Sequence, residues 1–444
     1  MDWSVSLANW LTQQLQGMPT EILQKASEMA GSRGPERILE LFLGDREAEE
    51  VRALLERDPV QGPRPAAVFL PGIMGSLLSS VRGISTLLWY APRVLLDGHL
   101  NLLDLDENGE DDRCPDVEIV PTGIEKVTYI KLVVALSRLA RPYEFPYDWR
   151  RPLEHNAHLL HRSLTRWTQA DPDRRFTLVC HSMGGMLART YTALYPEESE
   201  RLIERIVMLG TPLYGAPIAA CIFDGNTPQT RIVQRLNPSN DVIAFASNLP
   251  SAYQLLPPPP DLFTPDRPYP FDWDVYDAEA WGVPHVRQDY LDRARAWHER
   301  LAASDPQIEM AVIAGCHQET VTDVHMAAEP DDHGSRLRPE RRDGRHEGGD
   351  NQVPLWSTRH PSVTTYYIEC SHIELPAHGK VIDALGELLA GGAPELPQRV
   401  PERATSLLEK IAPIPLLEQV ADLRRHIEAG ETRREDIGRI TFLE

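Results

Sequence analysis

Short apolar runs alternate with longer segments of helical periodicity over most of this chain, and that alternation restricts the folds it can adopt. A strand that is buried on both faces reads as one continuous apolar run, as these runs do. The sequence therefore predicts an α/β fold, with a mostly parallel sheet and helices on both of its faces. The predicted strands are Ala66–Leu70, Tyr143–Pro146, Phe176–Cys180, Ile206–Leu209, Met310–Ala314 and Thr364–Cys370, and the predicted helices are Tyr129–Arg141, Glu154–Ala170, Gly184–Tyr195 and Val381–Leu389.

Changes in composition predict a core that is interrupted once and extended at both ends. A stretch rich in Pro, Trp and Tyr breaks the alternation, and we expect it to form a cap inserted over the sheet. A later polar stretch, 317–349, indicates a long loop or a hairpin. The predicted parts are a helical N-terminal extension (1–62), the first part of the core (63–212), the cap (213–308), the second part of the core (309–392) and a helical C-terminal extension (393–444). The extensions either cover the surface of the core or bind a partner or a second copy of the chain.

The net charge limits the partners of the chain. A formal net charge of -21 argues against binding to nucleic acid or to an anionic membrane. The five cysteines are odd in number and include no CxxC pair, so neither a disulfide scaffold nor a cysteine metal site is indicated. The N-terminus lacks the basic flank and apolar stretch of a signal peptide. No segment has the roughly 18 apolar residues of a membrane-spanning helix, and the expected compartment is the cytoplasm.

One serine lies where a predicted strand turns directly into a predicted helix. The segment FTLVCHSMGGMLAR places Ser182 between a strand that ends at Cys180 and a helix that begins at Gly184. So sharp a turn requires small side chains two positions before and after the serine, and Cys180 and Gly184 are small enough. The N–H groups at the start of the helix would face negative charge that develops beside the serine. This context predicts that Ser182 is a catalytic nucleophile.

Seven motifs follow one another in a characteristic order between residues 68 and 378. They are VFLPGIMGSLL (68–78), FPYDWRRPL (145–153), VCHSMGGMLAR (179–189), LGTPLYGAP (209–217), LPSAYQLLP (249–257), GGDNQVPLWS (348–357) and CSHIELPAH (370–378). In these motifs the chain resembles the lecithin:cholesterol acyltransferase and lysosomal phospholipase family, in particular its bacterial members. The resemblance implies an α/β-hydrolase fold and a serine hydrolase that acts on carboxylic ester bonds. The terminal extensions lie outside it.

The resemblance also implies which residues would work with Ser182. The acidic residue of the family opens a G-D-G-T-V-like segment, which corresponds to Asp350, although Asn351 and Gln352 replace the glycine and threonine that follow. The histidine of the family follows the last strand, and here that residue is His372. The resulting order Ser, Asp, His is the order that α/β-hydrolases use.

The chemistry that this resemblance implies is acyl transfer in two steps without a cofactor. His372 would take the proton of Ser182 as it attacks an ester carbonyl, while a carboxylate orients the imidazole. The backbone N–H groups of Ile73 and Met183 correspond to the oxyanion hole, where one donor is worth about 3 kcal/mol of the barrier. The predicted substrate is a lipid or another bulky apolar ester, with water as acceptor. Acyl transfer to an alcohol, hydrolysis of a small ester or lactone, and a non-catalytic scaffold remain alternatives.

Other residues compete for these roles. His378 is the alternative to His372, and His181 is expected to pack away from the reaction. The scattered histidines of the polar loop indicate a solvated surface, with a metal site as a minor alternative. The alternatives to Asp350 are Asp323, Asp331, Asp332 and Asp343, and the metal alternative comprises His317, His325, His333 and His346.

Five residues are expected to line or support a substrate site, with simple packing as the alternative for the four in the cap, namely Trp149, Leu213, Tyr214, Tyr253 and Leu255. The first belongs to the sequence Asp148-Trp149-Arg150. Because this sequence follows a predicted strand, it should lie near the carboxyl edge of the sheet, where sites form. It is either structural, with an ion pair beside a packed indole, or a support for the cap.

Overall fold

The computed structural model describes residues 45–56, 64–82, 86–283, 285–332, 334–342, 348–402, 415–429, 436 and 439–441. The helices expected before residue 45, including the run from Trp3 to Leu15, lie outside these residues. Within them, no helix is long and apolar enough to cross a membrane.

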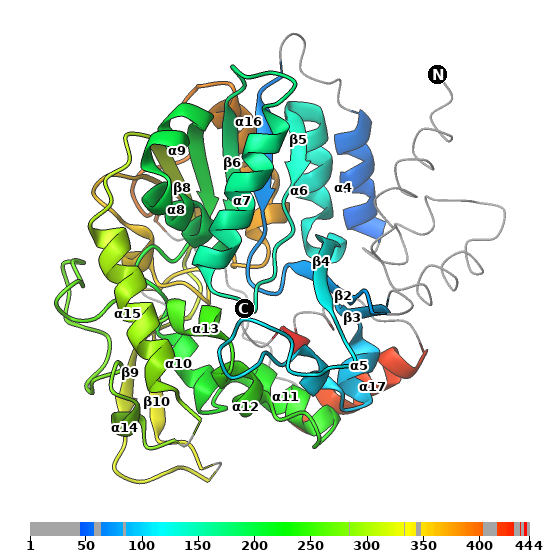
Figure 1. Ribbon diagram of the computed structural model, residues 1–444, viewed down its shortest axis with the longest axis vertical. Helices are drawn as coiled ribbons and strands as arrows, with labels where there is room; N and C mark the ends of the chain where they lie inside the picture. The colour runs from blue at the N-terminus through cyan, green and yellow to red at the C-terminus, as the bar shows by residue number, and fades with distance from the viewer. Residues whose placement is uncertain are drawn as a thin grey trace.

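A six-stranded parallel sheet forms the centre of the molecule (Figure 1). Val68 of the inner strand β1 lies opposite Tyr143 on one neighbour and Leu178 on the other. The strands, in the order β11-β8-β7-β6-β1-β5, are β11 (Thr364–Glu369), β8 (Glu309–Cys316), β7 (Ile203–Leu209), β6 (Phe176–His181), β1 (Ala66–Leu70) and β5 (Arg141–Glu144). All six predicted strands are present with slightly different ends, and the predicted fold class is confirmed.

Helices cover both faces of this sheet, as the apolar runs require. The flanking helices are α6 (Lys126–Leu139), α7 (Leu153–Trp167), α8 (Met183–Leu194), α9 (Pro196–Leu202) and α16 (Gly379–Leu389). Side chains that alternate along β1 enter different cores. Ala67 and Phe69 lie in the cluster with α6 and α16, whereas Val68 and Leu70 lie in the cluster with α7 and α8.

A second, three-stranded antiparallel sheet lies beyond one end of the main sheet, and the sequence analysis did not predict it (Figure 1). Its strands are short and include residues with low strand propensity, such as Pro121 and Gly123. The elements of this insertion are β2 (Ser76–Ser80), β3 (Thr86–Trp89), α5 (Pro92–Leu96), the 3₁₀ turn η2 (Leu100–Leu103) and β4 (Ile119–Ile124).

The segment between β7 and β8 is helical and lies at the same end of the main sheet (Figure 1). It is fastened to the core by hydrogen bonds: Ser251 donates to the carbonyl of Trp149 at 2.5 Å, and the N–H of Leu153 donates to Gln254 at 2.8 Å. Its helices are α10 (Ile218–Phe223), α11 (Pro228–Leu236), α12 (Val242–Ser247), α13 (Pro250–Gln254), α14 (Ala278–Trp281) and α15 (Gln288–Ala302). The polar stretch that follows β8 contains a hairpin of β9 (Thr320–Met326) and β10 (Leu337–Arg342).

One described helix from each end of the chain packs on the rest of the molecule. α4 (Asp45–Glu56) lies against α6, where Lys131 donates to Glu50 at 2.5 Å. α17 (Leu416–Ala429) buries Val420, Leu423 and Ile427 and lies against α5 and α11. Both described helices thus cover the chain's own surface, which is the first of the two roles that the sequence left open, and partner binding stays a prediction.

A buried ion pair ties the insertion after β1 to the segment after β5. Arg150 is wholly buried, and its Nε and Nη2 donate to the two carboxylate oxygens of Asp148 at 2.9 and 2.7 Å. The same guanidinium also lies 2.9 Å from Asp112 and donates to the carbonyl of Leu103 at 2.8 Å. This network bridges two segments of the fold, which favours the structural interpretation of Asp148-Trp149-Arg150.

Asp104, in the same insertion, is expected to destabilise the fold when it is ionised. Burial raises the pKa of Asp104 from 3.8 to about 6, and its Oδ1 has no partner among the described residues. Because the folded state keeps a proton that the unfolded chain releases, the free energy of unfolding falls as the pH rises from about 4 to about 6. Asp104→Asn should therefore raise that free energy by about 1–3 kcal/mol at pH 8 and by less than about 1 kcal/mol at pH 4. Urea unfolding at both pH values measures the difference, and an equal gain at both would contradict it.

Candidate active site

Ser182 occupies a strained turn at the carboxyl end of β6. Its backbone φ of 52° and ψ of -125° lie in a region that residues with a side chain rarely adopt. Neighbouring segments hold the turn: the N–H of Ser182 donates to the carbonyl of Leu209 at 2.9 Å, and Thr211 Oγ1 donates to the carbonyl of Ser182 at 3.0 Å. The chain then enters α8 directly, so the turn exposes the serine hydroxyl at the edge of the sheet.

Two glycines after the serine allow this turn to pack against its neighbours. A Cβ atom on Gly184 would lie 2.3 Å from the carbonyl oxygen of Leu70, and one on Gly185 would lie 2.1 Å from Thr211 Oγ1. The first contact is with backbone, which cannot move aside without disturbing β1. The sequence predicted that a small residue is required at position 184 but not at position 185, although the Gly-Gly pair was a signal for both.

Asp350 and His372 form a buried hydrogen-bonded pair. His372 Nδ1 lies 2.7 Å from Asp350 Oδ2, and the backbone N–H of His372 donates to the carbonyl of Asp350 at 2.7 Å. The other carboxylate oxygen accepts from the N–H groups of Gln352 and Val353 at 3.1 and 2.7 Å. Asn351 has a φ of 80°, a conformation that asparagine tolerates better than most residues, and so it can stand where the family has glycine.

Ser182 and His372 line the same cavity, which has a volume of about 220 Å³. Apolar side chains from α10 and from Leu255 form one part of its wall, and polar side chains form another. Arg341 is the one permanently charged residue in the described lining. The described lining consists of Ile73, Ser182, Pro212, Ala216, Ile218, Ala219, Ile222, Thr227, Pro228, Gln229, Leu255, Arg341, Asn351, Gln352, Val353 and His372. The sequence analysis did not single out α10, Gln229 or Arg341, because they come from segments that only the fold brings to the serine.

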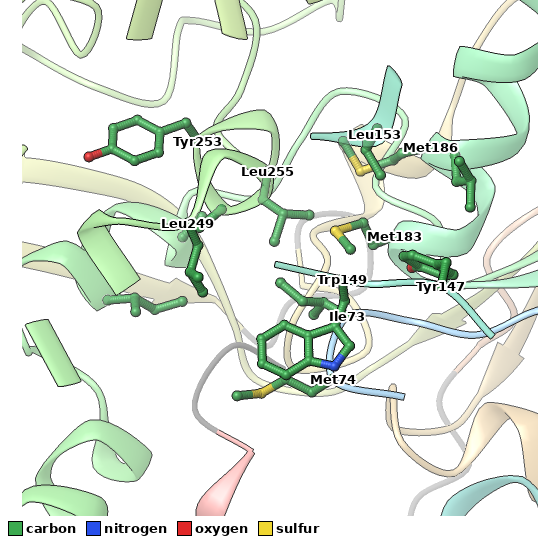
Figure 2. Packing of buried hydrophobic residues seen from close by; sticks show 14 of the residues in the cluster. Ile73, Met74, Tyr147, Trp149, Leu153, Met183, Met186, Leu249, Tyr253 and Leu255 are labelled. Carbon is green, nitrogen blue, oxygen red and sulfur yellow. The ribbon is translucent and has the colours of Figure 1, made fainter. Parts of the chain in front are cut away.

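Of the two residues expected to supply the oxyanion hole, one lines the cavity with Ser182 and the other follows Ser182 in the chain. Ile73 follows β1 and lines the cavity. Met183 is the first residue of α8, a position whose backbone N–H has no partner within its own helix. Figure 2 shows the side chains of both residues in one apolar cluster with Trp149 and Leu255.

The predicted substrate-site residues fall into different places. Leu255 lines the cavity, whereas Trp149 is wholly buried beside it and donates from Nε1 to the carbonyl of Ser76 at 3.2 Å. Leu213 is buried in the large core cluster. Leu255 is thus the member of this set that a bound molecule in the cavity would touch.

Tyr214 and Tyr253 do not line that cavity. Tyr214 lies in a separate surface groove, where its ring stacks on His360 with centroids 5.8 Å apart. Tyr253 is fully buried, and its hydroxyl donates to the carbonyl of Ser247 at 2.8 Å and accepts from the N–H of Arg287 at 3.0 Å. Tyr253 therefore packs the inside of the helical segment.

The competing residues lie elsewhere. His378 caps α16, accepting from the N–H of Lys380 at 3.3 Å, and lines a groove with Glu50. Asp323 pairs with Arg267, and Asp331 accepts from the N–H of Ser335 at 3.0 Å. Asp332 is exposed, and Asp343 lies outside the described residues.

The histidines considered for a metal site do not gather. His317 Nε2 lies 2.8 Å from the carbonyl of Pro401, and His325 lies between Asp272 and Glu340. His333 and His346 lie outside the described residues. Within the part of the chain that the structure describes, no group of three or more His, Cys, Asp or Glu side chains could hold a metal ion.

Comparisons with known proteins agree with the sequence motifs. Residues 140–331 match the sequence model of the lecithin:cholesterol acyltransferase family, a stretch that includes Ser182 and ends before Asp350. No curated protein matches the chain.

One solved structure shares the fold at low sequence identity, and two others align with lower TM-scores. The Tle4-Tli4 complex contains a chain that aligns over 74% of this chain and 99% of its own, with 14% identity and a TM-score of 0.50. The mature lipase BlEst2 of Bacillus licheniformis aligns over 75% and 96%, with 14% identity and a TM-score of 0.37. The RedJ thioesterase of Streptomyces coelicolor aligns over 76% and 94%, with 12% identity and a TM-score of 0.30.

The family match confirms the resemblance that the motifs indicated, and it supports an enzyme that hydrolyses esters or transfers their acyl groups. The parallel sheet and its flanking helices have the same architecture as the first of these structures. The chain thus has an α/β-hydrolase fold, and its residues 140–331 are similar to the lecithin:cholesterol acyltransferase family.

Proposed function

We propose that the chain is a serine acyl hydrolase with Ser182 as nucleophile, His372 as general base and Asp350 as the carboxylate that orients it. The observation that carries this proposal is the 2.7 Å contact between His372 Nδ1 and Asp350, both buried, beside a cavity that His372 shares with Ser182. A carboxylate on Nδ1 leaves Nε2 to accept the proton of the attacking hydroxyl. The strained turn at Ser182 supports the same assignment, because strain of this kind gathers at functional sites.

The backbone N–H groups of Ile73 and Met183 are the proposed oxyanion donors. Ile73 follows the strand next to β6, and Met183 begins the helix after the nucleophile, so both amides would flank the carbonyl oxygen of a bound ester. His372 would give the serine proton to the leaving alcohol and then take a proton from water, which attacks the acyl-enzyme, releases the acid and regenerates Ser182. No step requires a metal or a cofactor.

We infer that residues 213–308 act as a cap that selects the substrate. Ala219, Ile222 and Leu255 from this segment line the cavity next to Ser182. Their apolar side chains form a surface against which an apolar acyl group could pack. The net charge of -21 supports a neutral or cationic substrate surface over an anionic membrane, and the cytoplasm remains the proposed compartment.

A small ester that carries a polar group is a second candidate substrate. The cavity volume of about 220 Å³ falls below the roughly 300–1,000 Å³ of most ligand pockets, so a long acyl chain would have to extend out of it. The opposite part of the wall offers Thr227, Gln229 and Arg341 as hydrogen-bond donors.

Hydrolysis of p-nitrophenyl esters with acyl chains of two to sixteen carbons tests the proposal and separates the two candidates. Turnover that peaks at long chains supports a lipid enzyme, and turnover that peaks at short chains supports the small-ester candidate. Adding an alcohol acceptor to the same assay measures acyl transfer. Absence of turnover on every ester would overturn the assignment as a hydrolase.

Leu255→Ala is expected to shift the preferred acyl length without abolishing reactivity. The variant removes an apolar contact from the cavity wall but leaves Ser182 and His372 in place, so kcat/KM for the best ester should fall about five- to 100-fold relative to the acetyl ester. Tyr253→Phe is the matched control, because its hydroxyl faces Ser247 inside the cap. A fall of both rates by the same factor in Leu255→Ala would mean that Leu255 supports the fold instead.

A further inference from the structure

His181, the residue before Ser182, is hydrogen-bonded through both of its ring nitrogens. Nε2 lies 3.1 Å from the backbone carbonyl oxygen of His372, and Nδ1 lies 2.8 Å from the hydroxyl of Tyr129 on α6. The residues His181, Tyr129 and His372 are each at least 98% buried. His181 was expected to pack away from the reaction, and its side chain does not line the cavity, but it contacts the histidine turn directly.

The contacts fix the direction of each hydrogen bond. A carbonyl oxygen can only accept, so His181 Nε2 carries a hydrogen. Burial lowers the pKa of His181 well below its ordinary value, which keeps the ring neutral and makes Nδ1 an acceptor. The hydroxyl of Tyr129 therefore donates to Nδ1, and it accepts in turn from the backbone N–H of Gly72 at 3.1 Å.

The resulting chain of three hydrogen bonds joins three turns at one edge of the sheet. It starts at Gly72, directly before Ile73, passes through Tyr129 and through His181, directly before Ser182, and ends at the carbonyl of His372. The ring of Tyr129 is also held from the side by the ring of Phe69, with centroids 5.0 Å apart. Each turn that carries a proposed reacting group is thus connected to the other two.

We propose that Tyr129 and His181 are positioning residues that hold the His372 turn and the Ile73 turn in register with Ser182. Both backbone polar groups of His372 are fixed: its N–H donates to Asp350 at 2.7 Å, and its carbonyl accepts from His181. Loss of the second contact frees one side of the turn, and a displacement of about 1 Å can cost about a hundredfold in rate. This proposal rests on the proposed function of Ser182 and His372.

Tyr129→Phe tests the proposal, because it deletes one hydroxyl and keeps the ring. We expect kcat for p-nitrophenyl butyrate to fall about tenfold while KM changes less than about twofold, since one buried hydrogen-bonding group is lost and the cavity wall is untouched. His181→Leu should cost more, about 30-fold in kcat, and His181→Gln should recover part of that loss because its amide can still donate to the carbonyl of His372. The double variant Tyr129→Phe/His181→Leu should be no worse than His181→Leu alone.

Tyr191→Phe is the matched control. Tyr191 is also a wholly buried tyrosine, on α8, but its hydroxyl has no partner among the described residues, so its loss should leave kcat unchanged. Thermal unfolding of each variant identifies any that fail to fold. If a His181 variant fails to fold, the kcat of Tyr129→Phe decides the test. More than half of the wild-type kcat in folded Tyr129→Phe, or an equal loss in Tyr191→Phe, would overturn the proposal. A wild-type protein without esterase activity would instead refute the proposed function.

Discussion

Ser182→Ala is expected to lower kcat/KM for every ester by about five orders of magnitude while the protein stays folded. A nucleophile and its base act as a unit, so removing the hydroxyl abolishes the acyl-enzyme route and leaves only what substrate binding and the oxyanion donors contribute. The turn should survive, because the contacts that hold it come from the backbone N–H and carbonyl of Ser182. Steady-state kinetics and circular dichroism measure the two effects.

A fluorophosphonate probe gives an independent check on the same residue. The wild-type protein should be labelled at Ser182, which mass spectrometry of the labelled peptide can locate, and Ser182→Ala should not be labelled. Ser251→Ala is a control. The Ser251 hydroxyl donates to the carbonyl of Trp149 and should not be labelled in the wild type, so its removal should leave the labelling unchanged. Label on another residue, or more than a few per cent of wild-type activity in Ser182→Ala, would contradict the assignment.

Asp350→Asn is expected to lower kcat by about four orders of magnitude with little change in structure. The amide oxygen of asparagine can still accept from the N–H groups of Gln352 and Val353, so the turn is preserved. The other carboxylate oxygen, which faces His372 Nδ1, becomes an amide that donates, and it would favour the histidine tautomer that cannot accept the serine proton.

Asp323→Asn supplies the comparison for that variant. Asp323 pairs with Arg267 away from the cavity, and its replacement should leave kcat within about twofold of the wild-type value. If Asp323→Asn were the inactive variant, or if Asp350→Asn retained more than a tenth of the wild-type kcat, the acidic residue would have been assigned wrongly.

The main sheet could be predicted from the sequence because most of its strands contain continuous apolar runs that are buried on both faces, with the edge strand β5 (RPYE) as the exception. The second sheet could not, because β2 (SLLSS) and β4 (IVPTGI) interleave serine, proline and glycine with apolar residues and depend on pairing with each other. Strand propensity depends on such packing partners, which a local reading of the sequence does not contain.

The candidate site shows the same division between local and long-range signals. Ser182 followed from a strand, a turn and a helix that are contiguous in sequence, and Leu255 followed from an apolar motif. Tyr253 lies in that motif too, but helical geometry turns it into the interior of the segment after β7, while Leu255 faces the cavity. The contact of Tyr129 with His181 joins residues 52 positions apart, and no local pattern indicates it.

The position of α17 has a consequence for how the cavity could open. This helix contacts α5 in the insertion after β1 and α11 in the segment after β7, and Arg424 donates to the carbonyl of Leu236 at the end of α11. Thr227, Pro228 and Gln229, at the other end of α11, line the cavity. Any movement of α11 that opened the cavity would therefore have to carry α17 with it or break these contacts.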